Sequence, residues 1–356
     1  MKALALSFVA GIAAFVMTGC GSDSNNSTAA SPAPTVTLSA SNVDAAASAT
    51  ASAAMSSASM ADVNPVSTSK ASAGGDLAST VKARSLQRLL FDLTQQIVID
   101  RVMVKAAPGS SAMLRTQAVI TRMETCAVSG SVSAVLDDRD GSNTVSSGDL
   151  LTVTFDQCKP TATDLINGSV SATYSVVQVG PSFASASATV TYSQLQASST
   201  EGSFSIDGSF NYNLAQQGSV STAQLSIGVN NLTASVTGTS GSETVTLHAG
   251  YTVTATRDPD ALPPEGGSTA GLGTLTVNGA ISATSIGGTI VIATPMTIKQ
   301  YDVDPFPREG QVSVRGVNNG QLLLTVLSTS QVQVQLDADG DGTFELTKVV
   351  NWSALI

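Results

Sequence analysis

The sequence predicts a mainly β protein: a large antiparallel meander curled into an open or closed barrel, with one long N-terminal amphipathic helix. Two observations carry this. From about residue 128 to the end, apolar residues alternate with Ser, Thr, Asn and Gln, and the breaks between runs are rich in Gly, Asp and Asn. Alternation with period two buries one face of a sheet and leaves the other in water. A β-sandwich is the alternative architecture.

The helix is expected over residues 79–105. Large apolar residues recur there at spacings of three and four, which is helical periodicity. Ser79 or Thr80 can cap its start, and Pro108-Gly109 ends the run. Its apolar stripe has to be covered, and the apolar face of the sheet is the surface available for this. The stripe consists of Leu77, Val81, Leu86, Leu89, Leu90, Leu93, Ile97, Val98 and Val102.

A weak internal repeat runs through the strand region. Each copy places a Gly in the interior of an expected strand, and one period holds about two strands, a hairpin. Because a Gly inside a strand marks a bend or a close backbone approach, the repeat predicts a strongly curved sheet. Its concave groove seats the helix or an apolar ligand, unless the glycines serve curvature alone. The repeated glycines are Gly130, Gly168, Gly208, Gly279 and Gly316.

Residues 20–76 have a different composition from the rest of the chain. They are Ser, Ala, Thr and Asn with scattered Asp and few large apolar side chains. Such a segment buries too little apolar surface to offset the entropy of ordering. We therefore expect a flexible tether over 20–76 and one mainly β domain over 77–356.

The chain begins like an exported protein. Met1-Lys2 precedes an uncharged apolar run that ends in Met17-Thr18-Gly19-Cys20, the pattern of a secretory signal peptide. This ending resembles the lipobox of bacterial lipoproteins, although Met17 stands where that family usually has Leu. The resemblance implies a signal peptide over 1–19 and a Cys20 carrying fatty acyl chains such as palmitate. It also implies a membrane anchor in the cell envelope. Gly21 in place of Asp favours the outer membrane, with the protein facing the periplasm or the cell surface.

The cysteines and the net charge limit the kinds of site and partner that the protein can have. Cys126 and Cys158 remain as an even pair in an exported chain, which predicts a disulfide. With one His and no third free thiol, a zinc site is not expected. The chain has 16 Lys and Arg against 26 Asp and Glu, a net charge of −10. An acidic protein is a poor binder of nucleic acid, so we expect no nucleic-acid partner.

The stretch between two expected strands, DRDGSNTVSSGD, carries oxygen-bearing side chains at regular spacing. It resembles the calcium loop of EF-hands, in which positions 1, 3, 5, 7, 9 and 12 supply oxygen ligands. The dockerin variant, which ends in Asp, is more similar still. Here Asn143 replaces the usual Gly at position six, and strands flank the loop instead of helices. The resemblance implies a Ca²⁺ site formed by Asp138, Asp140, Ser142, Thr144, Ser146 and Asp149.

A second stretch, DADGDGTFE, resembles the start of the same calcium loop. Gly342 holds position six, but Lys348 stands at position twelve, so Glu345 or an acid from elsewhere has to complete the set. The resemblance implies a second Ca²⁺ site formed by Asp337, Asp339, Asp341 and Glu345. For both loops the alternative is an acidic hairpin turn, because Asp, Asn and Gly are ordinary turn residues.

The motifs of common enzyme classes are missing from the sequence. There is no G-x-S-x-G elbow, phosphate loop or H-E-x-x-H motif, and His248 falls on the polar face of an expected strand. We therefore predict a non-enzymatic structural or interaction module that binds an envelope protein and is anchored to the membrane by lipid. The alternative is a periplasmic carrier of an apolar ligand held between helix and sheet.

Overall fold

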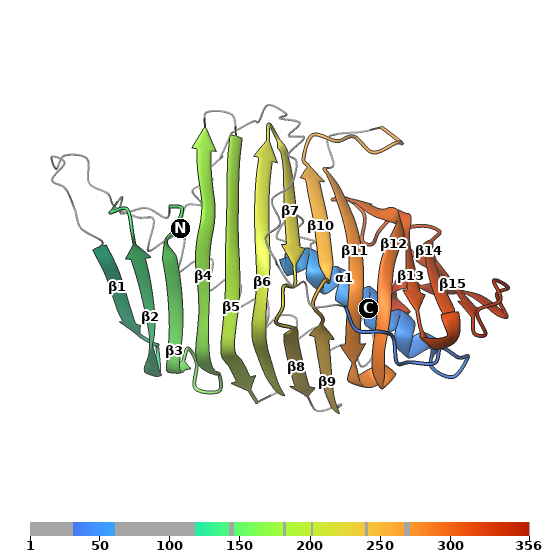
Figure 1. The fold of residues 1–356 in the computed structure, drawn as a ribbon, viewed down its shortest axis with the longest axis horizontal. Coiled ribbons are helices and arrows are strands. Elements are labelled where there is room, and N and C mark those ends of the chain that lie inside the picture. Colours follow the sequence, from blue (N-terminus) through green and yellow to red (C-terminus); the bar gives the residue numbers. More distant parts are fainter. Residues whose placement is uncertain are drawn as a thin grey trace, which may run out of the picture.

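The computed structural model describes residues 31–60, 118–141, 146–180, 183–200, 202–238, 241–266 and 271–355. Within these ranges the protein is mainly β, with one antiparallel sheet of 16 strands and one α-helix (Figure 1). The predicted fold class is confirmed at this level. The predicted signal peptide over 1–19, Cys20 and the helix expected over 79–105 lie outside the described residues.

The strands follow the chain as a meander in the order β1 to β7, then β10 to β16, while β8 and β9 lie off this path. Their bounds are β1 Ala118–Thr125, β2 Ser129–Asp138, β3 Leu150–Lys159, β4 Leu165–Gly180, β5 Phe183–Ser199, β6 Gly202–Gln217, β7 Val220–Ser226, β8 Leu232–Gly238, β9 Gly241–Leu247, β10 Thr252–Asp258, β11 Leu272–Ala283, β12 Gly288–Tyr301, β13 Glu309–Arg315, β14 Gln321–Val326, β15 Gln331–Asp337 and β16 Leu346–Asn351. The described ranges also contain the helix α1 Val43–Met60 and three 3₁₀ turns: η3 Thr284–Ile286, η4 Val317–Asn319 and η5 Trp352–Ala354.

A partial ring interrupts the meander between β6 and β11. β6 pairs with β8 along its first half and with β7 along its second half, and β11 likewise pairs with both β9 and β10. In Figure 1, β8 and β9 lie below β7 and β10 in the same sheet. β1 and β16 stand at opposite ends of the strand order and do not pair with each other within the described ranges. The described strands therefore form one sheet and not the two of a sandwich.

Alternation along each strand creates an apolar and a polar face, as predicted. In β10, Val253 and Ala255 are buried, while Thr254 and Thr256 between them are only partly buried. The polar face is held by cross-strand hydroxyl contacts such as Thr256 Oγ1 to Thr274 Oγ1 at 2.5 Å. Most buried residues of the apolar faces belong to one continuous core.

Two glycines of the repeat, Gly130 and Gly168, lie opposite bulges of the neighbouring strand. Gly130 and Gly168 both have positive φ, and a Cβ on either one would lie 2.0 Å and 2.3 Å from the carbonyl oxygens of Gln157 and Gln194, respectively. Both glutamines themselves adopt positive φ, and the register of β3 and β5 shifts beside them. Neighbouring backbone therefore fills the space that a side chain would occupy, so these glycines do not open a groove for a ligand.

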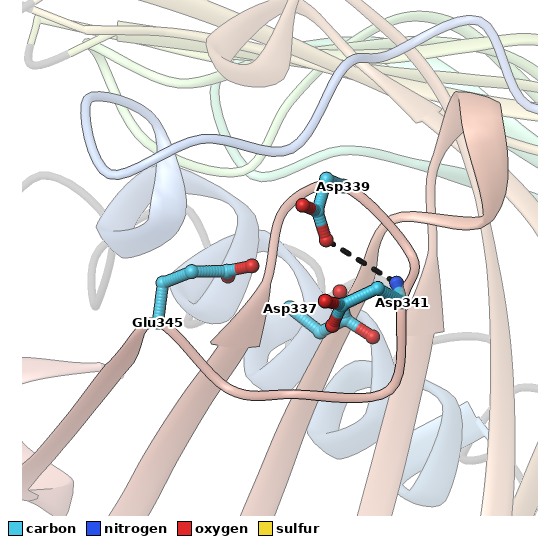
Figure 2. A group of neighbouring side chains, drawn as sticks. All are labelled: Asp337, Asp339, Asp341 and Glu345. Carbon is cyan, nitrogen blue, oxygen red and sulfur yellow. Dashed lines mark hydrogen bonds between the residues drawn. The ribbon is translucent and has the colours of Figure 1, made fainter.

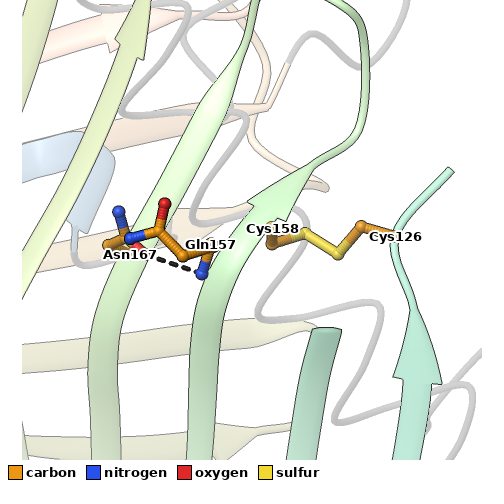
Figure 3. Close-up of a disulfide and its surroundings, with 4 residues drawn as sticks. All are labelled: Cys126, Gln157, Cys158 and Asn167. Carbon is orange, nitrogen blue, oxygen red and sulfur yellow. Dashed lines mark hydrogen bonds between the residues drawn. A yellow bond between two sulfur atoms is a disulfide. The ribbon is translucent and has the colours of Figure 1, made fainter. Parts of the chain in front are cut away.

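In two copies of the repeat, the side chain of the residue before the glycine accepts a hydrogen bond from the backbone of a bulged glutamine. Asn167 Oδ1 accepts a hydrogen bond from Gln157 N at 2.7 Å (Figure 3), and Asp207 Oδ1 accepts one from Gln194 N at 2.9 Å. A bulge frees a backbone N–H from the ladder, and an adjacent side-chain oxygen satisfies it. The repeated sequence thus marks the same kind of bulge on successive hairpins.

Helix α1 lies in the segment that the composition assigned to a flexible tether. That interpretation is wrong for the described part of the segment, because residues between 36 and 54 pack into the core. Ala46 and Ala47 are fully buried, and α1 packs against η3, β10, β11 and β14 on the apolar side of the sheet (Figure 1). Ala has the highest helix propensity, and its small side chain lets a helix approach the sheet closely. Among the described residues, no helix combines the length and the apolar character needed to cross a membrane.

An extended stretch before α1 is also fixed to the sheet. Thr35 N donates to Thr289 O at 2.9 Å, and Thr289 N donates to Thr35 Oγ1 at 2.9 Å. Val36 O accepts from Val317 N at 2.9 Å. A Cβ on Gly316 would lie 2.6 Å from Val36 O, so the last glycine of the repeat makes room for this stretch.

Candidate metal sites

The first candidate site lies at the tip between β2 and β3. Carboxylate oxygens of Asp138, Asp140 and Asp149 lie within 4.8 Å of one another. Asp138 is the last residue of β2, and Asp149 directly precedes β3, so the two strands fix their spacing. Both of these carboxylates are fully buried, whereas Asp140 is exposed. Three of the six predicted ligands are thus brought together.

Hydrogen bonds hold Asp149 in this position. Its Oδ1 accepts from Arg139 N at 2.9 Å, and its Oδ2 accepts from Ser146 N at 2.7 Å. Its backbone is tied to β4, because Tyr174 N donates to Asp149 O at 2.9 Å. The position of this carboxylate is therefore set before any ion binds.

Ser146, also a predicted ligand, lies beside this cluster. Its hydroxyl oxygen is buried and has no hydrogen-bond partner in the part of the chain that the structure describes. A buried hydroxyl without a partner costs free energy, which an oxygen-seeking cation would recover. The remaining two predicted ligands, Ser142 and Thr144, lie outside the described residues.

The second candidate site occupies the loop between β15 and β16. Oxygens of Asp337, Asp339, Asp341 and Glu345 lie within 4.8 Å of one another, and Figure 2 shows their side chains converging on the space inside the loop. All four predicted residues are therefore brought together, with Glu345 beside the three aspartates. Lys348, at position twelve, instead contacts Asp44 of α1.

Backbone N–H groups shape this second loop. Asp337 is buried at the end of β15 and accepts hydrogen bonds from Gly340 N at 2.7 Å and Gly342 N at 2.9 Å. Glu345 Oε2 accepts from Ala338 N at 2.8 Å, which draws its carboxylate back over the loop. The carboxylates of Asp337 and Glu345 thus accept hydrogen bonds from the backbone of their own loop, which fixes their positions.

The carboxylates of this loop repel one another. The largest influence on Asp339 is the N–H of Asp341, at 3.2 Å, which favours the ionised form. Desolvation and the negative charges of Asp341 and Glu345 outweigh it, so the pKa of Asp339 lies above its ordinary value. A bound cation would remove this repulsion, and an all-oxygen set with several carboxylates suits a hard cation such as Ca²⁺.

The predicted disulfide is present between Cys126 and Cys158 (Figure 3). It joins the end of β1 to β3 across the end of β2, with a Cα–Cα distance of 5.4 Å. Cys126 N also donates to Gly130 O at 3.0 Å, which keeps this end of β1 paired with β2. The first acidic cluster lies at the opposite end of the same strands.

His248 is a residue whose surroundings the sequence did not reveal. Its Nε2 lies 2.6 Å from Ser282 Oγ, which lies 2.8 Å from Thr289 Oγ1. Partial burial lowers the pKa of the His248 imidazole, because desolvation favours the neutral ring. The polar periodicity places both His248 and Ser282 on the wet face, but nothing in the sequence gives the strand register that brings them together.

Comparison of the chain with protein-family models, with curated proteins and with solved structures found no match.

Proposed function

We propose that this chain is an exported, lipid-anchored protein of the cell envelope that acts as a non-enzymatic structural or interaction module stabilised by calcium. The observation that carries the calcium part is the convergence of Asp337, Asp339, Asp341 and Glu345 in one loop. The disulfide supports an oxidising compartment, because disulfides persist mainly in exported proteins. The lipid anchor rests on the resemblance of residues 17–20 to a lipobox.

The rigid body of this module is the sheet with α1 on its apolar side. Part of the proposal is that the C-terminal half of the sheet curls around α1 as an open barrel, which Figure 1 supports through the position of the helix behind β10 to β13. The acidic tips lie at hairpin ends of this body. A cation there would join the two strands that enter each tip, so the expected effect of calcium is stability and not chemistry.

The carrier of an apolar ligand has less support in the described residues. Ala46 and Ala47 of α1 are fully buried, and the repeated glycines are filled by neighbouring backbone. One surface pocket, of about 240 Å³, is lined by residues of β4 to β6, among them Leu165, Asn167 and Phe204. Because α1 packs on η3, β10, β11 and β14, this pocket does not lie between helix and sheet.

The test is a calorimetric titration of the full-length chain with CaCl₂, with thermal melts in calcium and in chelator. We expect binding heat and a higher Tm in calcium, since a ligand that binds only the folded state stabilises it. Asp341→Asn should weaken binding at the second loop. Asp260→Asn, a change in the exposed acidic turn after β10, is the matched control and should leave binding unchanged. Absence of heat together with equal melting temperatures in both buffers would rule out the calcium part.

A further inference from the structure

A surface pocket of about 240 Å³ lies on the polar face of β4, β5 and β6. Its side chains form two rows across the three strands, because the strand register sets them opposite one another. The rows are Leu165, Ser198 and Ser203, and Asn167, Gln196 and Ser205. Ala197 and Phe204 also line the pocket, but their side chains are buried on the apolar face, so they contribute backbone.

The pocket begins directly beyond a bulge in β5. The register of β5 shifts around Gln194 relative to both β4 and β6, and a bulge bends the strand that contains it. Beyond the bend, β4 supplies the larger side chains Leu165 and Asn167, whereas β5 and β6 supply three serines. These short side chains leave the space that the pocket occupies above the sheet.

Most polar side chains of the pocket are available to a ligand. Within the described ranges, those that make no hydrogen bond are Gln196, Ser198, Ser203 and Ser205. Farther along the same two strands, opposed side chains bond each other instead. Ser187 Oγ donates to Asn213 Oδ1 at 2.6 Å, and Thr189 Oγ1 donates to Asn211 Oδ1 at 2.9 Å.

The amide of Asn167 is held in one orientation. Its Oδ1 accepts the N–H of Gln157 at 2.7 Å (Figure 3). Its Nδ2 has no partner in the described part of the chain and is left to donate to a ligand. The pocket therefore combines one fixed donor with amide and hydroxyl groups that both donate and accept.

The chemistry of the lining selects the class of ligand. No charged side chain lines the pocket among the described residues. An ionised ligand would lose hydration there without gaining an ion pair, and an apolar ligand would cover unpaired hydroxyls. A neutral sugar meets neither penalty, because its hydroxyls donate and accept and its C–H groups suit Leu165. Since one water occupies about 30 Å³ in the liquid, the pocket has room for a sugar ring with its substituents.

We propose that this pocket binds one neutral hexose unit, with Asn167 and Gln196 hydrogen-bonded to its hydroxyls and Leu165 against its C–H groups. Because the pocket opens on the surface of the sheet, the unit belongs either to a free sugar or to a glycan chain. A ligand of about a dozen non-hydrogen atoms should bind there with a Kd in the millimolar range. The inference goes beyond the proposed function and needs neither the lipid anchor nor calcium.

The test is saturation-transfer NMR of the full-length chain, kept in a detergent without a sugar headgroup. The probes are D-glucose, D-galactose, D-mannose and N-acetyl-D-glucosamine, each titrated to about 50 mM, well above the expected Kd. We expect saturable transfer to at least one of these neutral sugars. D-glucuronate and D-galacturonate should bind at least about fivefold more weakly, because each places a charge in an uncharged pocket.

Variants of the lining locate the binding. Gln196→Ala and Ser205→Val should each raise the Kd of the bound sugar by about fivefold, the factor for one lost hydrogen bond. Ser209→Val makes the same change on the same face of β6, outside the pocket, and should leave the Kd unchanged. An intact Cys126–Cys158 disulfide and unchanged circular dichroism verify that each variant is folded.

A trisaccharide of the sugar that binds, such as maltotriose for D-glucose, distinguishes the two sources. A lower Kd for the trisaccharide assigns the pocket to a glycan chain, and an equal or higher one assigns it to a free sugar. The proposal is overturned if all four neutral sugars fail to give a saturable signal or if the uronates bind equally well. Binding that is unchanged in both pocket variants, or that is lost in Ser209→Val, also overturns it.

Discussion

At the scale of single residues, the sheet depends on positions where only glycine fits. Gly168 combines a φ of 99° with a neighbouring carbonyl oxygen 2.3 Å from where a Cβ would lie. Gly218, in the turn after β6, has a φ of 59° and nothing within 4 Å of that point. Substituting both glycines therefore distinguishes two contributions to the free energy of unfolding. Both positions have the unfavourable backbone conformation, but only Gly168 adds a steric clash.

Gly168→Ala should therefore lower the free energy of unfolding by about 2–4 kcal/mol, the range of a strained backbone combined with overpacking. Gly218→Ala should cost only about 1 kcal/mol, since it adds strain without a clash. Chemical denaturation of both variants measures the difference. Equal losses would show that β4 and β5 move apart easily at this bulge.

Asp339 gives a prediction whose sign changes with calcium. Its pKa is raised in the folded loop, so the folding stability associated with it is full below the pKa of the unfolded chain and is lost as pH rises through the folded pKa. In chelator at pH 7, Asp339→Asn should therefore leave Tm unchanged or raise it by about 1 °C.

In calcium the same Asp339→Asn change should lower Tm, because it removes a ligand. The Asn side chain keeps an oxygen for the N–H of Asp341, so the turn itself is preserved. Melts in both buffers decide the question. A lower Tm in chelator as well would mean that the carboxylate is needed for the fold of the turn and not for an ion.

At the scale of elements, β1 to β3 are fastened at one end by the disulfide, and their other end carries the first acidic cluster. Replacing Cys126 and Cys158 together with Ala should cost about 3–4 kcal/mol, as expected for loss of a cross-link that closes a loop of 32 residues. Hydrogen exchange should then rise first in β1, which has β2 as its only strand neighbour within the described ranges. Uniform loss of protection across β1 to β6 would instead show that these strands unfold as one unit.

The elements also show which features the sequence could predict. Strong alternation predicted the antiparallel sheet, and close acidic spacing predicted which carboxylates converge. The helix α1 was not predicted, because Ala and Ser also dominate disordered segments. Composition alone therefore does not distinguish a buried helix of small residues from a flexible tether. Two further features were not predicted, because both depend on strand register. They are the interruption between β7 and β8 and the contact of His248 with Ser282. Register is set by bulges that period-two alternation does not reveal.

At the scale of the whole molecule, the sheet has two unlike ends. The β16 end carries Lys348 and its contact with α1, whereas the β1 end presents a regular, exposed strand with charges of both signs. A sheet of this width gains little from further intramolecular pairing, because both of its ends lie far apart along the strand order.

The docking of Thr35 and Val36 determines where the molecule takes mechanical load. Within the described residues, tension from the N-terminal side meets the sheet at the hydrogen bonds to Thr289 and Val317. Beyond them, Leu38 and Val43 are buried, so the load is spread into the core before it reaches the end of α1. These contacts lie in the C-terminal half of the sheet, whereas β1 stands at its far end. A pull on the N-terminal side would thus be borne by β12 and η4, at a distance from β1.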